Sequence, residues 1–196
     1  MDTSQITMAS LEVVEEVGLE RLTMRLVADR LGVQVGGLYY HLPDKAALLR
    51  SMANELCARA LAAIDEVPPS PSWPDAVAQA CGRLRATLHA HRDGALILAS
   101  GPLNGSLGSL ALMERLIELV QRGIPAERAN LAADTLMAYL TGFVHQEQLQ
   151  AANPYPFPLS MDEMRARFPL VFRSSDDDED AMFDAAVRSI LAGFAG

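Results

Sequence analysis

The chain has 196 residues, half of them apolar, and a formal net charge of −9 at pH 7. That charge excludes a protein that nucleic acid coats over its whole surface, since such a protein would be strongly basic. No apolar stretch approaches the roughly 20 residues of a membrane-spanning helix, and MDTSQITMAS is unlike a signal peptide. We therefore expect a cytoplasmic protein with no membrane partner.

The composition favours an all-α fold of one or two domains, because β-branched runs are scarce. Apolar residues at helical spacing predict a first helix from Ile6 to Val17, which Gly18 ends. Cys57 and Cys81 lack the spacing of a metal site, so we expect two buried free thiols, with a disulfide as the lesser alternative.

Residues 23–42 predict a helix, a glycine turn and a short second helix. Thr23 is a good N-cap, and Gly32 supplies the left-handed residue that ends the first of these helices. Leu38 and Leu42 would hold the second helix to the core, and Pro43 disfavours its continuation. A short helix held across another by a tight turn can enter the major groove of DNA, although an ordinary helical hairpin would give the same outline.

The second helix of this pair has unusual residues. Gln34 is a weak N-cap, and Gly36 and Gly37 each cost about 0.8–1 kcal/mol relative to alanine inside a helix. The two glycines either let the backbone approach DNA closely or leave the helix poorly formed until DNA binds. Residues 21–50 carry five basic side chains against two acidic ones, a small basic footprint on an acidic protein.

The remaining helices follow in order along the chain. Asp44 caps a long helix to about Asp65, and the proline-rich segment 67–74 is the best internal boundary. Further helices are predicted at residues 72–88, 93–100, 110–123, 125–150, 160–168 and 180–194. In this scheme Asp93 caps the short helix GALILAS.

The motifs LTMR, ADRLGV and LYYHLPDK, taken together, resemble the tetracycline-repressor-like (TetR) family of bacterial regulators. The later segments HRDGALILASGP, LTGFVHQEQ and FDAAVRSILAGF resemble the ligand domain of its tetracycline-repressor branch more loosely. The resemblance implies a DNA-binding domain at residues 1–50 and a ligand-binding and dimerisation domain at 51–196. The implied DNA-binding residues are Thr23, Arg25, Gln34, Val35, Gly36, Gly37, Tyr39, Tyr40, His41 and Lys45.

The resemblance does not extend to tetracycline or magnesium. Leu98 stands where the branch has a histidine, and Gly101 and Arg115 stand where it has threonine and glutamine. A small, more apolar effector is therefore expected, with no cofactor and no metal. The candidate pocket residues, each of which could equally be plain core, are Leu88, Leu98, Leu103, Leu112, Met113, Leu116, Tyr139, Phe143 and His145.

The second helix of the pair at residues 23–42 is short and can contact few bases. The resemblance implies that two chains form a homodimer, which places two such helices on a palindromic operator. The expected interface is a four-helix bundle made by the helices at 125–150 and 180–194 of two chains. Its candidate residues are Ala132, Leu136, Leu140, Phe143, Phe183, Val187, Ile190 and Phe194.

Two other classes of function compete with a ligand-responsive repressor. An enzyme is disfavoured because the sequence holds no G-x-S-x-G, no H-E-x-x-H and no phosphate-binding glycine loop. The stronger alternative is a small-molecule- or partner-binding protein of the same fold that has weak or lost DNA binding through Gly36 and Gly37.

Overall fold

The computed structural model describes residues 1–68, 70–101, 105–152, 158–171 and 178–195, and over these ranges it contains helices and no strands. The helices are α1 (Thr3–Val17), α2 (Met24–Leu31), α3 (Val35–His41), α4 (Lys45–Asp65), α5 (Trp73–His89), α6 (Gly94–Ala99), α7 (Leu107–Val120), α8 (Ala126–Ala152), α9 (Met161–Arg167) and α10 (Glu179–Ala195). The all-α prediction is confirmed. No helix among the described residues is long and apolar enough to cross a membrane.

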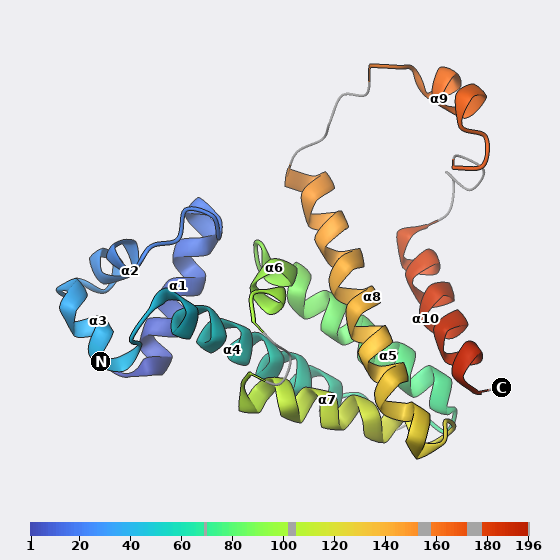
Figure 1. Cartoon of the computed structure of the whole chain (residues 1–196), viewed down its shortest axis with the longest axis horizontal. Coiled ribbons are helices and arrows are strands. Elements are labelled where there is room, and N and C mark those ends of the chain that lie inside the picture. Colours follow the sequence, from blue (N-terminus) through green and yellow to red (C-terminus); the bar gives the residue numbers. More distant parts are fainter. Residues whose placement is uncertain (69, 102–104, 153–157, 172–177, 196) are drawn as a thin grey trace.

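The molecule has two parts, joined by one long helix (Figure 1). We call α1–α3 the head, and α5–α8 with α10 the body. α4 packs against α1 at one end and against α5, α6 and α7 along the rest of its length. It runs without a break through residues 50 and 51, where the family resemblance places the division between the two domains. α4 is therefore a rigid connection between head and body.

Side-chain caps fix where the helices begin. Asp2 and Gln5 form a reciprocal capping box at the start of α1, and Asp44 accepts a hydrogen bond from the backbone N–H of Ala47 at the start of α4. Ser72 does the same for α5, which also has a proline in its first turn. Each such cap contributes on the order of 1 kcal/mol, so the chain specifies these boundaries locally.

The core is continuous from head to body. Leu48, Met52 and Leu56 are fully buried along one face of α4, which makes that helix part of both halves of the core. Burial of one such side chain stabilises the fold by about 1.5–3 kcal/mol. Ala129, Ala132 and Ala133 are also fully buried, and their small size lets the neighbouring helices approach α8 closely.

The apolar seams of α8 and α10 face the inside of this one chain, because α10 packs on α8 and on α5. Ala132, Leu136, Leu140, Phe183 and Val187 are buried there, while Phe143, Ile190 and Phe194 are partly buried against the same core. The predicted interface residues therefore pack within the chain, and their part in a dimer stays a prediction. The surface that these helices leave open carries Leu131, Leu149 and Met182.

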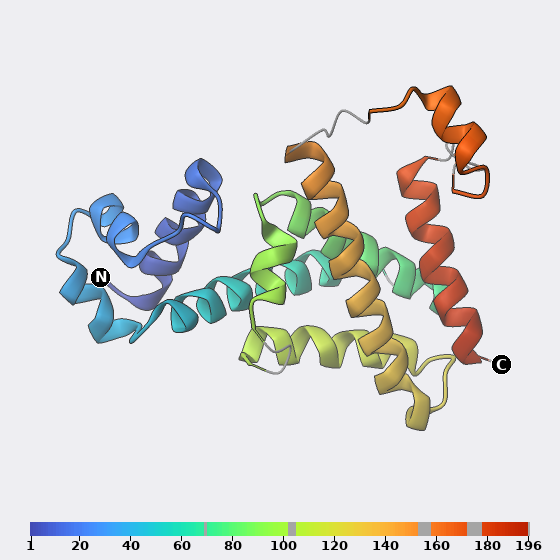
Figure 2. The same cartoon turned by 45° about the horizontal axis from the view of Figure 1, so that its top comes forward.

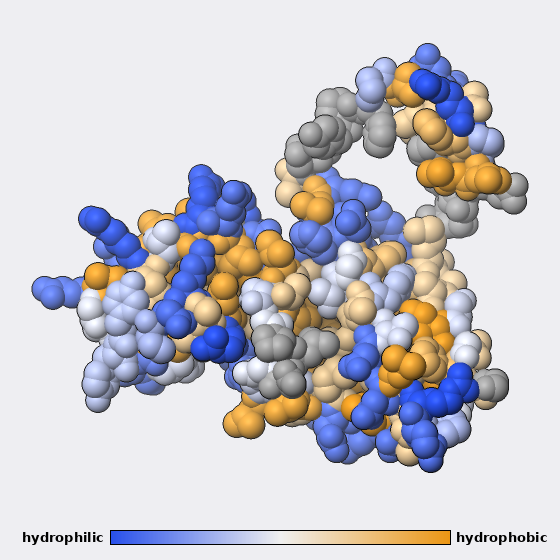
Figure 3. Space-filling view, viewed as in Figure 1, coloured by the Kyte–Doolittle hydropathy of each residue, from blue (hydrophilic) through white to orange (hydrophobic). Residues whose placement is uncertain are grey.

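α9 lies apart from the head and the body (Figures 1 and 2). Figure 3 shows apolar atoms on the segment that contains α9, residues 158–171, where Phe168, Leu170 and Val171 are exposed. Its capping box, formed by Ser160 and Glu163, gives the short helix a defined start although it has few tertiary contacts.

Candidate DNA-binding face and effector cavity

The turn between α2 and α3 is built by local hydrogen bonds. The Thr23 hydroxyl accepts the N–H of Leu26 at 3.2 Å, and Gly32 takes a left-handed conformation with φ of 67°. The Gly32 N–H points back to the carbonyls of Ala28 and Asp29, which ends α2 and turns the chain. Leu38 is fully buried and anchors α3 to the rest of the head.

α3 presents its other side to solvent. Tyr40 is 89% exposed and Tyr39 is 49% exposed, and the edge of the Tyr40 ring lies against His41 with 5.4 Å between ring centroids. His41 itself is half-buried. The remaining residues predicted for DNA binding are all exposed on or beside α3: Thr23, Arg25, Gln34, Val35, Gly36, Gly37 and Lys45. The structure thus leaves the predicted side chains accessible on and next to the head, His41 in part.

The two glycines of α3 are not required by packing. A Cβ atom added to Gly36 would meet nothing within 4 Å, and one added to Gly37 would meet only the Met1 side chain at 3.7 Å. Neither residue has a positive φ angle. The fold of the head therefore gives no reason for glycine at either position, and Gln34 makes no side-chain cap to compensate.

The charge of this face is smaller than the sequence count implies. Arg30 forms ion pairs with Glu12 and Glu16 of α1, so its charge is already matched within the head. Arg25 and Lys45 have no ion pair among the described residues, and both are exposed. These two side chains are the basic groups best placed to meet a phosphate.

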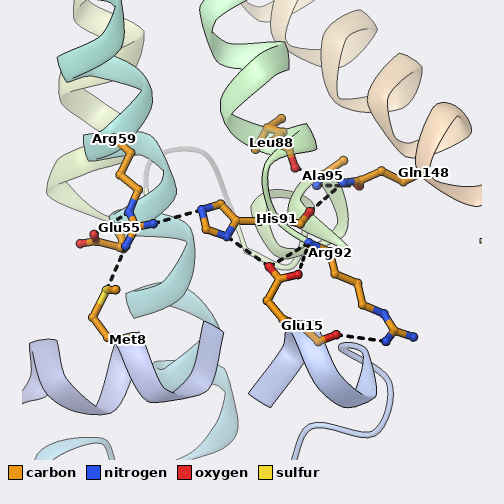
Figure 4. Close-up of polar contacts among 9 residues, drawn as sticks. All are labelled: Met8, Glu15, Glu55, Arg59, Leu88, His91, Arg92, Ala95 and Gln148. Atoms are coloured by element: carbon orange, nitrogen blue, oxygen red, sulfur yellow. Dashed lines mark hydrogen bonds and ion pairs between the residues drawn. The ribbon is translucent and has the colours of Figure 1, made fainter. Parts of the chain in front are cut away.

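The loop between α5 and α6, residues 90–93, joins the head to the body (Figure 4). The Glu15 carboxylate accepts the Arg92 backbone N–H at 3.0 Å, and the Arg92 guanidinium donates to the carbonyls of Glu15 and Glu16. His91 lies between Glu15, at 3.3 Å, and Arg59 of α4, at 3.1 Å. Sequence reasoning missed this contact, because its partners lie more than 70 residues apart and no periodicity records them.

Asp93 does not play the predicted capping role. It stands at the N-cap position of α6 but makes no side-chain hydrogen bond to that helix. Its carboxylate instead accepts the N–H of Leu19 at 2.7 Å, just beyond the end of α1. The prediction of an Asp93 cap is therefore wrong, because a left-handed backbone turns its side chain toward the head.

The predicted pocket residues that the structure describes lie in several parts of the body. Leu88, Leu98, Leu112 and Leu116 are buried; Met113, Tyr139, Phe143 and His145 are partly buried; Leu103 lies outside the described residues. Leu98 lines a shallow cavity of about 260 Å³ between α6 and α8. Tyr139 and Phe143 pack on Phe183 of α10, with ring centroids 5.9 and 5.2 Å away. That these residues contact an effector stays a prediction.

A more enclosed cavity of about 390 Å³ lies between the end of α4, α5 and α7. Ile64, Ala76, Ala80 and Leu119 give it an apolar lining. Arg115 and Glu118 stand at the same cavity and pair with each other, and Arg115 also pairs with Asp65 of α4. The sequence did not indicate this space, because alanines at helical spacing look the same whether they line a core or a cavity.

A compact charged network lies where α5, α8 and α10 meet. Arg85 of α5 pairs with Glu147 of α8 and with Asp180 of α10, and lies 4.9 Å from the centroid of the Phe183 ring. Burial by itself would raise the pKa of Glu147, but hydrogen bonds from Arg85 and His89 lower that pKa below its usual range.

Burial raises the pKa of the Cys81 thiol to about 12, and it also raises the pKa of the Cys57 thiol. Both cysteines are free.

Two protein families match this chain. Residues 6–52 match the tetR family of bacterial regulatory proteins, and residues 67–196 match the tetracyclin repressor-like C-terminal domain. The class G tetracycline repressor of Vibrio anguillarum is 30% identical over 203 residues, which cover 99% of this chain and 93% of the relative.

Solved structures agree in fold. A possible TetR-family regulator from Streptomyces coelicolor has a TM-score of 0.81 at 26% identity and covers 98% of both chains. A TetR variant from Acinetobacter baumannii in complex with minocycline has a TM-score of 0.75 at 26% identity, and the match covers 99% of this chain and 96% of that one. With a family match over more than half of its length, the chain belongs to the TetR family of transcription factors, and is a DNA-binding regulator rather than an enzyme.

Proposed function

We propose that the chain is a ligand-responsive repressor that binds a palindromic operator as a homodimer and is released by a small, largely apolar effector. The observation that carries the proposal is the difference in burial along α3: Leu38 is fully buried, while Tyr40, two positions later, is 89% exposed. An aromatic ring exposed to water on a helix that Leu38 anchors suits contact with a base edge or sugar. Residues 1–50 would then serve DNA binding, and residues 51–196 ligand binding and dimerisation.

The residues around α3 divide by the part of DNA that each would meet. Gln34, Val35, Tyr39 and Tyr40 would face the major groove, while Thr23, Arg25, His41 and Lys45 would lie near phosphates. Base contacts give discrimination, whereas phosphate contacts give position and salt dependence. Gly36 and Gly37 would let the backbone of α3 come close to the DNA.

Two variants test this division. We expect Tyr40→Ala to weaken operator binding at least tenfold, because it removes a contact to the groove and leaves the buried side of α3 intact. Lys45→Ala should weaken binding to all sequences to a similar extent and reduce the salt dependence. Fluorescence anisotropy with a duplex selected by the wild-type chain from random DNA, and with a scrambled duplex, measures both. Unchanged affinity in both variants would contradict the assignment of α3.

A homodimer would place two α3 helices about 34–36 Å apart, on successive major grooves. We assign the interface to the outward faces of α8 and α10, around Leu131, Leu149 and Met182, since their inward seams pack within the chain. Leu131→Glu should shift the chain toward monomer in analytical ultracentrifugation. A wild-type chain that is monomeric at micromolar concentration would contradict the dimer.

The effector site that we favour is the cavity of about 390 Å³ between α4, α5 and α7. Ile64 lies in the last turn of α4, and Lys45 at the other end of that helix follows α3. A ligand that displaces Ile64 would therefore tilt α4 and change the spacing of the paired heads. Arg115, Glu118 and Arg122 at the cavity leave room for a few polar groups on a mostly apolar molecule.

Linkage gives the decisive test of regulation. An effector that lowers DNA affinity must itself bind more weakly when DNA is present, by the same factor, typically 1–3 kcal/mol of coupling. Ligands found by a thermal-shift screen should bind less tightly to the DNA complex in calorimetry. If every ligand binds both forms equally, the chain is a DNA-binding protein without this switch. The alternative, a ligand- or partner-binding protein with lost DNA binding, would be favoured if no duplex is selected.

A further inference from the structure

The C-terminal end of α1 is held by one short loop of the body. Leu19 donates its N–H to Asp93 at 2.7 Å, and Arg92 donates from its side chain to the last carbonyls of α1, those of Glu15 and Glu16. Figure 4 shows the Arg92 side chain reaching from the loop to the end of this helix. The terminal carbonyls of a helix lack partners within it, so these bonds satisfy groups that otherwise need water.

The same loop is held on its other side by α8. Gln148 accepts the N–H of Ala95 at 3.2 Å, and its amide donates to the carbonyls of Leu88 and His91 at 3.0 and 2.8 Å. One side chain of α8 thus bonds to residues before, within and after the loop. A path of hydrogen bonds runs from α8 through Gln148, the loop and Asp93 to α1, and it does not pass through α4.

The backbone of the loop has little freedom. Asp93 has a φ of 56° and is the one non-glycine residue with positive φ in the part of the chain that the structure describes. Next to it, a Cβ atom on Gly94 would lie 2.2 Å from the carbonyl oxygen of Leu88. A non-glycine residue keeps such a conformation only where its surroundings enforce it, and such positions concentrate at switches and functional sites.

The other side of the loop is open. A cavity of about 440 Å³ is lined by His91, Arg92, Asp93 and Gln148, together with His89 and the last two residues of α8. The loop is therefore packed against α1 but not enclosed, so it has room to shift if its bonds are released.

We infer that Asp93 and Gln148 are positioning residues for DNA binding: through the α5–α6 loop they fix the angle of the head to α8. Because α8 is the helix that we assign to the dimer interface, this joint acts together with α4, to which His91 of the loop bonds through Arg59, in setting the distance between the two heads. The inference rests on the proposed homodimer. It assigns no DNA contact to either residue. A fixed head does not lose orientational freedom when it binds, so loosening the joint lowers affinity.

A matched pair of variants at one position tests the joint. Asp93→Gly adopts the left-handed backbone readily but loses the bond to Leu19, whereas Asp93→Asn tolerates that backbone and keeps an acceptor oxygen. We expect Asp93→Gly to weaken binding to the selected duplex about tenfold, and Asp93→Asn to remain within twofold of wild type. Glu114→Gln, an exposed change on α7, controls for the altered net charge.

Two further readouts separate positioning from contact or misfolding. Affinity for a scrambled duplex and the slope of affinity against salt should be unchanged in Asp93→Gly, because no phosphate contact is lost. In the free protein, hydrogen exchange of the Leu19 amide should accelerate in Asp93→Gly and not in Asp93→Asn. Gln148→Leu, which changes only α8, should reproduce the loss of affinity for the selected duplex.

The outcomes distinguish this inference from the proposed function. A wild-type chain that selects no duplex overturns the function, while the Leu19 exchange experiment still reports on the joint. Wild-type operator affinity in Asp93→Gly, or equal losses in Asp93→Gly and Asp93→Asn, overturns the joint. So does a loss that follows the unfolded fraction measured by circular dichroism, or a reduced salt slope.

Discussion

The helices of the head and of the body share the same apolar spacing, but their proposed functional residues lie on different sides of it. In the head, functional residues are those that the fold leaves outside: Tyr40 is exposed two positions after the buried Leu38. In the body, the proposed effector would bind among apolar residues, and Leu88, Leu98 and Leu112 are as buried as any core residue. A DNA-binding surface can thus be recognised from large side chains that the fold leaves exposed. The residues that line a ligand cavity, in contrast, have the same apolar helical spacing as the residues of the core.

Single glycines show the same difference between the body and the head. Gly94 in the body is required by packing, since any side chain would collide with the backbone of Leu88. Gly36 in the head faces open space, so packing within the chain does not require glycine there. Packing thus fixes glycine at residue 94 in the body but not at residue 36 in the head, where the proposed DNA contact is the restriction to test.

The largest effect is expected at Gly94. Gly94→Ala should destabilise the fold by about 3 kcal/mol, because its methyl group would be placed 2.2 Å from the Leu88 carbonyl oxygen and the backbone must shift. Urea unfolding monitored by circular dichroism measures this free energy. Gly82→Ala is the matched control: it lies within α5, meets nothing within 4 Å, and should stabilise by up to about 1 kcal/mol. Similar stability in the two variants would show that the loop is not sterically restricted.

The sequence predicts the head well because its determinants are local. The Thr23 cap, the left-handed Gly32 and the Asp44 cap each act within four residues, and the structure has all three. The body depends on long-range pairing. The Asp93–Leu19 bond and the packing of α10 on α8 and α5 join distant segments. Periodicity therefore gave the helices and the buried side of α8, but neither the role of Asp93 nor which helices cover α8.

A smaller effect is expected from the charged network of the body. Glu147 bonds to both Arg85 and His89, and Glu147→Gln should cost about 2 kcal/mol, the range for hydrogen bonds to charged groups. Because the pKa of Glu147 is lowered in the folded chain, its contribution is present above the usual carboxyl pKa and is lost as the pH falls through the folded value.

The wild-type chain should therefore lose stability relative to Glu147→Gln as the pH falls from about 6 to 3, around and below the usual glutamate pKa. Urea unfolding across this range measures the difference. Asp184→Asn, which alters an exposed pair with Arg188 on α10, should show a much weaker dependence. A difference between wild type and Glu147→Gln that does not change with pH would contradict the role assigned to this carboxylate.

We expect the smallest change in stability at Gly36. There, a substitution should stabilise the free protein but weaken its complex with DNA. Alanine has open space there and a higher helix propensity, so Gly36→Ala should stabilise the free protein by up to about 1 kcal/mol. If the backbone of α3 approaches DNA closely, the added methyl group should nevertheless weaken binding to the selected duplex. Anisotropy and urea unfolding on the same preparation measure both quantities. A variant that is more stable and binds DNA equally well would show that Gly36 is kept neither by the fold nor by the DNA contact.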